Sequence, residues 1–199
     1  MKTTISIALL FALFAPMSLF AADSSQANEF PAIPHPQGFL DKEPASDTAT
    51  LRAEAEKGNA VAQYHLGIMY ANGQEVEKNV MEAIRFLSLA AEQGHLDAQF
   101  NLGRTYMSGN YIEEALYWYA KAAAAGHRAS QNNIGRLYAL GKGVQQDYVQ
   151  AYKWWLLSAR QGDRIAEKNL IKLKAKMNAT QIAEAERLVE EWLESAREK

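Results

Sequence analysis

The chain has 199 residues, of which 48% are hydrophobic and 22% charged, a composition that is ordinary for a globular protein. Its formal net charge of −2 lacks the strongly basic balance of a nucleic-acid-binding protein, so we expect no nucleic acid among its partners. It contains no cysteine, which excludes disulfides, thiol chemistry and a cysteine-linked lipid anchor, and removes the usual thiol ligands of zinc.

Residues 1–21 have the features of a Sec-type secretory signal peptide. Lys2 supplies a positive charge, and Ile5–Phe14 form an apolar run that is too short for a membrane span. Ala21 and Ala22 are small residues suited to cleavage after either one. We therefore expect a periplasmic or secreted protein with no membrane insertion after signal cleavage.

Residues 22–46 hold four prolines and little hydrophobic periodicity. This composition favours a proline-rich extended linker. The alternative, that this segment packs along the rest of the chain, remains open because it also contains large apolar residues. From residue 47 the apolar residues fall at helical spacing, so we expect a helical domain over residues 47–199.

The sequence pattern of a helix pair is repeated several times within this domain. In the clearest copy, small and apolar residues recur at helical spacing from Ala98 to Tyr106 and from Ala115 to Gly126, with a Gly-Asn turn between. The glycines that close successive copies lie 36, 32 and 36 residues apart, and they are Gly58, Gly94, Gly126 and Gly162. Such a period is typical of a solenoid of stacked helix pairs.

The closing glycines predict repeats at about 58–93, 94–125 and 126–161. A half repeat precedes them and a degenerate cap, residues 162–199, follows them, so we expect capping helices at both ends. Together these segments predict roughly seven or eight helices and no strand between residues 47 and 197.

Small residues at corresponding places in the copies indicate that the paired helices approach closely. Gly103 and the Ala122-Ala123 pair have almost no side chain. We expect the rings of Tyr106 and Trp118 to fill the space beside this crossing. The aromatic residues of the repeats are therefore interpreted as core rather than as a sugar-binding surface.

The copies share Ala-x3-Leu-Gly-x2-Tyr in the first helix, Ala-x2-Trp-x3-Ala-Ala in the second, and a closing Gly, with Gly-x-Gly-Val in one connecting loop. This pattern resembles the Sel1-like repeat, a relative of the tetratricopeptide repeat, over residues 51 to about 195. The middle copy departs from it with a short turn at Gly109-Asn110-Tyr111. The resemblance implies an all-α fold, a right-handed α-α superhelix or solenoid, in an exported bacterial protein. It also implies a non-enzymatic scaffold or adaptor of the cell envelope.

Candidate chemical sites are few. His95 and His127 each follow a closing glycine, and without cysteine or a His-x3-His pair we interpret them as turn or cap residues rather than metal ligands. Glu113 and Glu114 have no matched acid–base partner, and no Ser-x-x-Lys motif occurs. We therefore expect no catalytic residue, no cofactor and no bound metal.

One polar series recurs on the first helices, opposite their apolar arc. It consists of an Asn before the repeat's Leu or Ile and a basic residue after its Gly, namely Asn101, Arg104, Asn133, Arg136, Asn169 and Lys172. Side-chain amides hydrogen-bond an extended backbone, and guanidinium groups bind carboxylates. Tetratricopeptide domains that clamp a carboxylate use the matching positions. The alternative, that these are ordinary solvated residues, also remains open.

These observations predict a monomer that binds a protein or peptide partner on its concave face, which the first helices would line. The alternative function is an envelope glycan or peptidoglycan-associated binding module. That module would use Tyr64, Phe100 and Trp155 as exposed aromatic residues.

Overall fold

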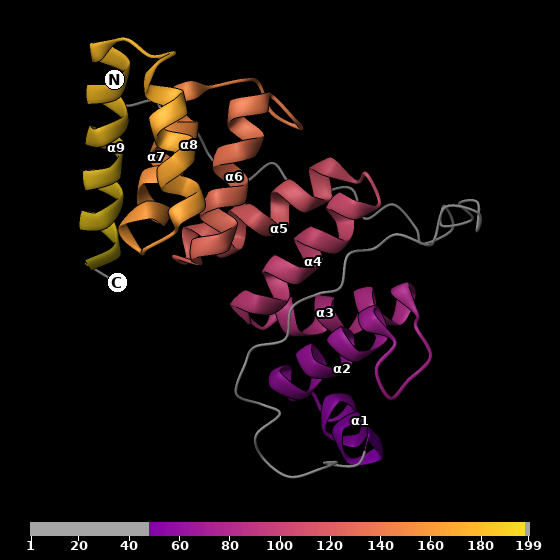
Figure 1. Ribbon diagram of the computed structural model, residues 1–199. Helices are drawn as coiled ribbons and strands as arrows, with labels where there is room; N and C mark the ends of the chain where they lie inside the picture. Colours follow the sequence, from indigo (N-terminus) through magenta and orange to yellow (C-terminus); the bar gives the residue numbers. More distant parts are fainter. Residues whose placement is uncertain (1–47, 198–199) are drawn as a thin grey trace, which may run out of the picture. The chain divides into compact units, whose positions relative to one another are not determined.

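A computed structural model describes residues 48–197, and Figure 1 shows them as a series of helices. The described residues form nine α-helices and no strand. The helices are α1 (Thr48–Glu56), α2 (Ala60–Asn72), α3 (Val80–Glu92), α4 (Leu96–Ser108), α5 (Ile112–Ala124), α6 (Arg128–Leu140), α7 (Tyr148–Arg160), α8 (Arg164–Lys174) and α9 (Ala179–Arg197). The expected signal peptide (1–21) and linker (22–46) lie outside the described residues.

The all-helical prediction is confirmed for residues 48–197, but the predicted number of helices is too low. The half repeat and the degenerate first helix each form a complete helix, α1 and α8. Each is held by its own buried residues: Leu51 and Ala55 in α1, and Ala166, Leu170 and Leu173 in α8. Burial of these few apolar side chains is enough to fix helices of 9 and 11 residues in a packed setting.

The central six helices form three pairs, α2 with α3, α4 with α5 and α6 with α7. Successive pairs also pack, because α3 contacts α4 and α5 contacts α6. Each pair buries its apolar face partly within itself and partly against the next pair, which is the arrangement of an α-solenoid. The core is therefore shared between neighbouring repeats.

Glycines in the first helices allow the close approach that the sequence predicts. A Cβ atom placed on Gly67, Gly103 or Gly135 would lie 2.7–2.8 Å from a side chain of the second helix. The facing side chains are Leu87, Tyr119 and Trp155.

The ring that lies directly against Gly103 is that of Tyr119, which sequence reasoning does not single out. Tyr106 and Trp118 are half-buried and pack beside the crossing as predicted. Both lie against the core cluster that contains Leu102 of α4, and Tyr106 also lies against the cluster that contains Ala115 of α5.

A buried glutamine recurs one residue after the first small residue of each first helix. The three side chains, Gln63, Gln99 and Gln131, are at most 5% exposed. Each Nε2 donates to the carbonyl oxygen eight residues earlier, at 3.0, 3.0 and 3.2 Å. This bond ties the start of each first helix to the end of the helix before it.

In the first and third repeats, a second glutamine donates a hydrogen bond to the amide oxygen of the buried glutamine, and in the middle repeat none does. Gln93 Nε2 donates to Gln63 Oε1 at 2.7 Å, and Gln161 Nε2 donates to Gln131 Oε1 at 2.8 Å. The equivalent position in the middle repeat is Ala125, and Gln99 Oε1 is buried there without a hydrogen-bond partner.

The C-terminal cap pairs its helices differently from a repeat. Helix α9 packs along α7 and does not form with α8 the extensive pair seen in each repeat. Tyr152 Oη donates to Glu186 Oε1 at 3.2 Å, and Arg160 pairs with Glu190 at 2.7 Å. On α8, Ile171 occupies the repeat's glycine position and is 73% exposed, so the face that would take a second helix is open.

We predict that Ala125→Gln stabilises the protein by about 1 kcal/mol, because its amide would supply the donor that Gln99 Oε1 lacks. Ala125 has φ −86°, close to the values of −79° and −93° at Gln93 and Gln161, so the backbone accepts the same side chain. Urea unfolding of the two proteins measures the difference. Ala125→Glu is the control, since it has the same shape without the donor; an equal gain in this variant would contradict the explanation.

We predict that Gly103→Ala destabilises the protein by about 1–3 kcal/mol through overpacking against Tyr119. Helix propensity alone predicts the opposite sign, a gain of about 1 kcal/mol. Thermal or urea unfolding decides between the two. In a Tyr119→Ala background the loss should largely disappear, and a loss that persists there would place its origin elsewhere.

Candidate functional site

The predicted polar series lies on three helices of the solenoid, and its members differ in exposure. Helix α4 carries Asn101 and Arg104, α6 carries Asn133 and Arg136, and α8 carries Asn169 and Lys172. Arg136 and Lys172 are exposed, whereas the side chain of Asn101 is buried with 3% of its surface accessible. We call the side of α4 and α6 that carries the first four residues the first-helix face.

Asn101 is a buried structural residue, which corrects the prediction that it faces solvent. Its Nδ2 donates to the carbonyl oxygen of Asp97 at 2.9 Å and to Tyr64 Oη on α2 at 3.4 Å. The tyrosine of the preceding repeat covers the amide, so helical periodicity within α4 alone could not reveal its burial. Its Oδ1 is buried without a hydrogen-bond partner.

Tyr64, which accepts a hydrogen bond from Asn101, lies near charged side chains of both signs, Asp97 and Arg104. Burial raises the pKa of the Tyr64 hydroxyl to about 12, and the Asp97 carboxylate adds to this, while Asn101 and Arg104 oppose it. The hydroxyl therefore keeps its proton at neutral pH and remains both a donor and an acceptor.

Three of the predicted residues influence the pKa of Tyr119 on α5. Burial raises the pKa of its hydroxyl to about 12, against the opposing effects of Arg104, Arg136 and Asn133. Both guanidinium groups thus act on the same phenol, although they belong to successive first helices. Asn169 and Lys172, one repeat further along, are not among the groups that act on either tyrosine.

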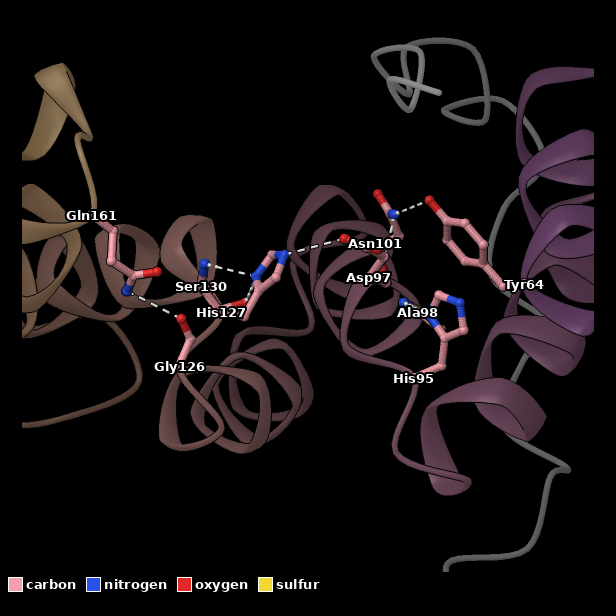
Figure 2. A network of polar contacts seen from close by, with 9 residues as sticks. All are labelled: Tyr64, His95, Asp97, Ala98, Asn101, Gly126, His127, Ser130 and Gln161. Carbon is pink, nitrogen blue, oxygen red and sulfur yellow. Dashed lines mark hydrogen bonds and ion pairs between the residues drawn. The ribbon is translucent and has the colours of Figure 1, made fainter. Parts of the chain in front are cut away.

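A polar link joins α4 to α6 beside these residues (Figure 2). His127 Nε2 lies 3.3 Å from Asp97 Oδ1, and His127 Nδ1 lies 3.2 Å from the backbone nitrogen of Ser130. The hydrogen bond to His127 lowers the pKa of the Asp97 carboxyl below its ordinary value. Asp97 is half exposed, so a carboxylate stands next to the cationic part of the face.

The cap interpretation of the two histidines is confirmed. His95 is the N-cap of α4 and His127 is the N-cap of α6, and each side chain accepts a hydrogen bond from a backbone N–H of its helix. Within residues 48–197, no group of three or more His, Asp or Glu side chains is arranged to hold a metal ion.

The aromatic residues of the alternative function do not form an exposed platform. Tyr64 is 3% exposed and Trp155 is 6% exposed, because the first contacts α4 and the second lies against Gly135. Phe100 is half-buried, with its ring centroid 5.0 Å from that of His127. The prediction of an exposed aromatic surface at these three residues is therefore wrong.

The first-helix face offers hydrogen-bond donors and acceptors together with charges of both signs. Amide and guanidinium groups suit a peptide backbone and a carboxylate, and Asp97 suits a cationic side chain. Helical spacing also places Asp97 on this side of α4, but sequence reasoning missed Tyr64 and Tyr119 as its neighbours. The sequence did contain a signal for Tyr119, because it stands four residues after the first alanine of the repeat pattern in its second helix, Ala115. Leu87 and Trp155 stand at the same position in the other two repeats.

Comparison with known proteins gives matches to repeats and to solved structures. The family model of the Sel1 repeat matches residues 60–95, 96–127 and 128–163. A Sel1 repeat protein from Oxalobacter formigenes has 38% sequence identity and a TM-score of 0.58, over 64% of this chain and 99% of that one.

A protective antigen of uropathogenic Escherichia coli with an SLR fold has 30% identity and a TM-score of 0.48, over 77% of this chain and 42% of that one. No curated protein matches. None of the helices in residues 48–197 has the length and apolar character of a membrane span.

Sel1 repeats generally indicate a protein–protein interaction scaffold, and proteins built from them are generally non-enzymatic. The three matched repeats together cover more than half of the chain, and they coincide with the helix pairs α2–α3, α4–α5 and α6–α7. This chain is a member of the Sel1 repeat family.

Proposed function

We propose that this protein is a non-enzymatic scaffold of the bacterial cell envelope that binds an extended, mixed-charge segment of a partner protein on its first-helix face. The observation that carries the proposal is that α4 and α6, which both pack on α5, each carry an asparagine followed three residues later by an arginine, Asn101 and Arg104 on α4 and Asn133 and Arg136 on α6. Two guanidinium groups one repeat apart form a series of contacts along a chain rather than a single-point site.

The chemistry of the face favours a polypeptide ligand. A half-buried Asn133 amide supplies a donor and an acceptor to a backbone of any sequence. Arg104 and Arg136 supply charge-assisted hydrogen bonds to carboxylates. Asp97 argues against a simple anion trap, because its carboxylate repels a partner that carries negative charge alone.

The envelope location rests on the N-terminal sequence. Lys2, the apolar run Ile5–Phe14 and the small residues Ala21 and Ala22 are the features of an export signal. The absence of cysteine in the whole sequence is compatible with an oxidising compartment, because the protein then has no thiol to oxidise.

We predict that Arg104→Ala combined with Arg136→Ala weakens peptide binding by about 1–3 kcal/mol. Full-length protein, labelled and applied to an array of mixed-charge peptides, identifies ligands, and calorimetric titration of the strongest ones measures the loss. Urea unfolding of the same double variant tests whether the fold is retained, since surface substitutions usually change stability little.

A second double variant provides the matched control. Lys57 and Lys142 are exposed basic residues in the turns that follow α1 and α6, outside the helical positions of the first-helix face, so Lys57→Ala with Lys142→Ala removes the same charge. Binding should survive this change. Equal binding by wild type and the Arg104, Arg136 variant would refute the assignment of the face. Equal losses of affinity in both double variants would also refute it, because they would show that binding depends on the net charge of the protein and not on these two positions.

We predict that mature protein isolated from its native cells begins at Ala22 or Asp23. Intact-mass spectrometry and N-terminal sequencing of periplasmic and cytoplasmic fractions test this. Full-length protein confined to the cytoplasm would contradict the envelope location while leaving the peptide-binding proposal to its own experiment.

A further inference from the structure

The N-cap residues of the first helices differ between the outer and the central repeats. The cap follows the closing glycine in every copy, and the four residues are Asn59, His95, His127 and Asp163. Asn59 and Asp163 accept backbone N–H groups through oxygen atoms at 2.8–3.1 Å. The two central caps accept theirs through an imidazole nitrogen, at 3.3 Å in His95 and 3.2 Å in His127.

An imidazole caps a helix only when the accepting nitrogen carries no proton. In both residues that nitrogen is Nδ1, so the neutral ring must carry its hydrogen on Nε2. In His127 the Nε2 atom that would carry this hydrogen lies 3.3 Å from Asp97 Oδ1 (Figure 2). Protonation converts Nδ1 into a donor, which removes the cap and places a positive charge at the unfavourable N-terminal end of the helix dipole. Oxygen caps have no such sensitivity near neutral pH.

The surroundings make the two histidines unequal. The ring of His95 stacks on Tyr64 of α2 with centroids 4.5 Å apart, and Asp97 of its own helix is the charged group that acts on it. His127 meets the Asp97 carboxylate directly, and the uncharged ring of Phe100 lies beside it. His127 therefore lies within ion-pairing distance of a carboxylate, whereas His95 forms no ion pair within residues 48–197.

We propose that mild acid opens the first turn of α4 through protonation of His95 and thereby releases the Asp97–His127 link between the second and third repeats. Asp97 is the second residue of α4, so its carboxylate keeps its place beside His127 only while this turn is formed. The proton acts on the folded chain itself, and no bound partner is required. Asn101 and Arg104 lie further along the same helix, after the turn that opens.

The direction of the effect follows from the pKa of His95, which burial lowers below the ordinary value of 6.5, against smaller opposing effects of Asp97 and the backbone. A lowered histidine pKa means that the closed turn binds a proton less readily than the open one. The contribution of the His95 cap to the stability of this turn is complete above pH 6.5, and it is lost as the pH falls toward the lowered pKa of His95.

Hydrogen exchange of the full chain between pH 7.5 and pH 5, with rates corrected for intrinsic exchange, tests the proposal. We expect protection of the amides of Ala98 and its neighbours to fall by roughly two- to thirtyfold relative to those of Ala62. Ala62 is the matched internal reference, because Asn59 caps its helix. Constant relative protection across this range would overturn the proposal.

His95→Asn is the decisive variant, since the first repeat uses asparagine at the same position and the fold already accepts it. The variant should keep the first turn of α4 protected at pH 5, and it should keep the Asp97–His127 link. Nitrogen-15 spectra of the imidazole rings supply the second measurement, with a neutral Nε2–H tautomer expected in wild type at pH 7.5. A pH response retained by His95→Asn, or an Nδ1–H tautomer of His95, would refute the mechanism.

Discussion

The contact between Gly103 and the ring of Tyr119 is the constraint on which both the packing and the candidate site depend. A side chain at residue 103 would meet ring carbons at 2.8 Å, so the glycine is what lets the tyrosine lie across α4. The ring is 1% exposed and fills the crossing, while the charges of Arg104 and Arg136 lower the pKa of its hydroxyl against the effect of burial. One residue of the second helix thus closes the core beside the two first helices that carry the polar residues of the candidate site.

The fold was largely predictable because most of its determinants are local. Closing glycines and helical spacing predicted the three pairs. His95 and His127 were interpreted as turn or cap residues because each follows a closing glycine, and each does accept a hydrogen bond from the backbone N–H three residues ahead. The errors and omissions concern contacts between elements. The burial of Asn101 depends on Tyr64, 37 residues earlier, and the identity of the ring at Gly103 depends on how α5 is rotated. Such rotations are set by the packed partner, and the spacing within one helix does not contain them.

The incomplete cap at the C-terminal end has the same physical origin. Helix α9 has one buried face, with Ala185 and Val189 fully covered, and the sequence pattern predicts that face correctly. It does not specify the neighbour that covers the face. Hydrogen bonds from Tyr152 and Arg160 join α7 to α9, and Ala185 of α9 lies in one buried cluster with Leu170 and Leu173 of α8. Helix α8 carries Ile171 at the position where each repeat carries the glycine that lets a second helix approach closely.

The middle repeat departs most from the chain's own pattern, and the departures gather on α4. Its turn to α5 has three residues, whereas the other two turns have seven. Among residues 48–197, the two buried side-chain oxygens without a hydrogen-bond partner, Gln99 Oε1 and Asn101 Oδ1, both belong to α4. Each such atom costs about 1–3 kcal/mol, a substantial part of the 5–15 kcal/mol that is typical of a whole domain.

In a solenoid, stability is nearly a sum of repeat and interface contributions, so a local deficit stays local instead of being spread over the fold. Helix α4 should therefore be the weakest of the central helices, and it is also the helix that joins Tyr64 to His127 across the first-helix face. A polar face of this kind is built by replacing packing residues with amides and charges whose partners the repeat does not fully supply. Of the two unsatisfied oxygens on α4, that of Asn101 belongs to the polar face, whereas that of Gln99 follows from Ala125, which stands where the other repeats carry glutamine.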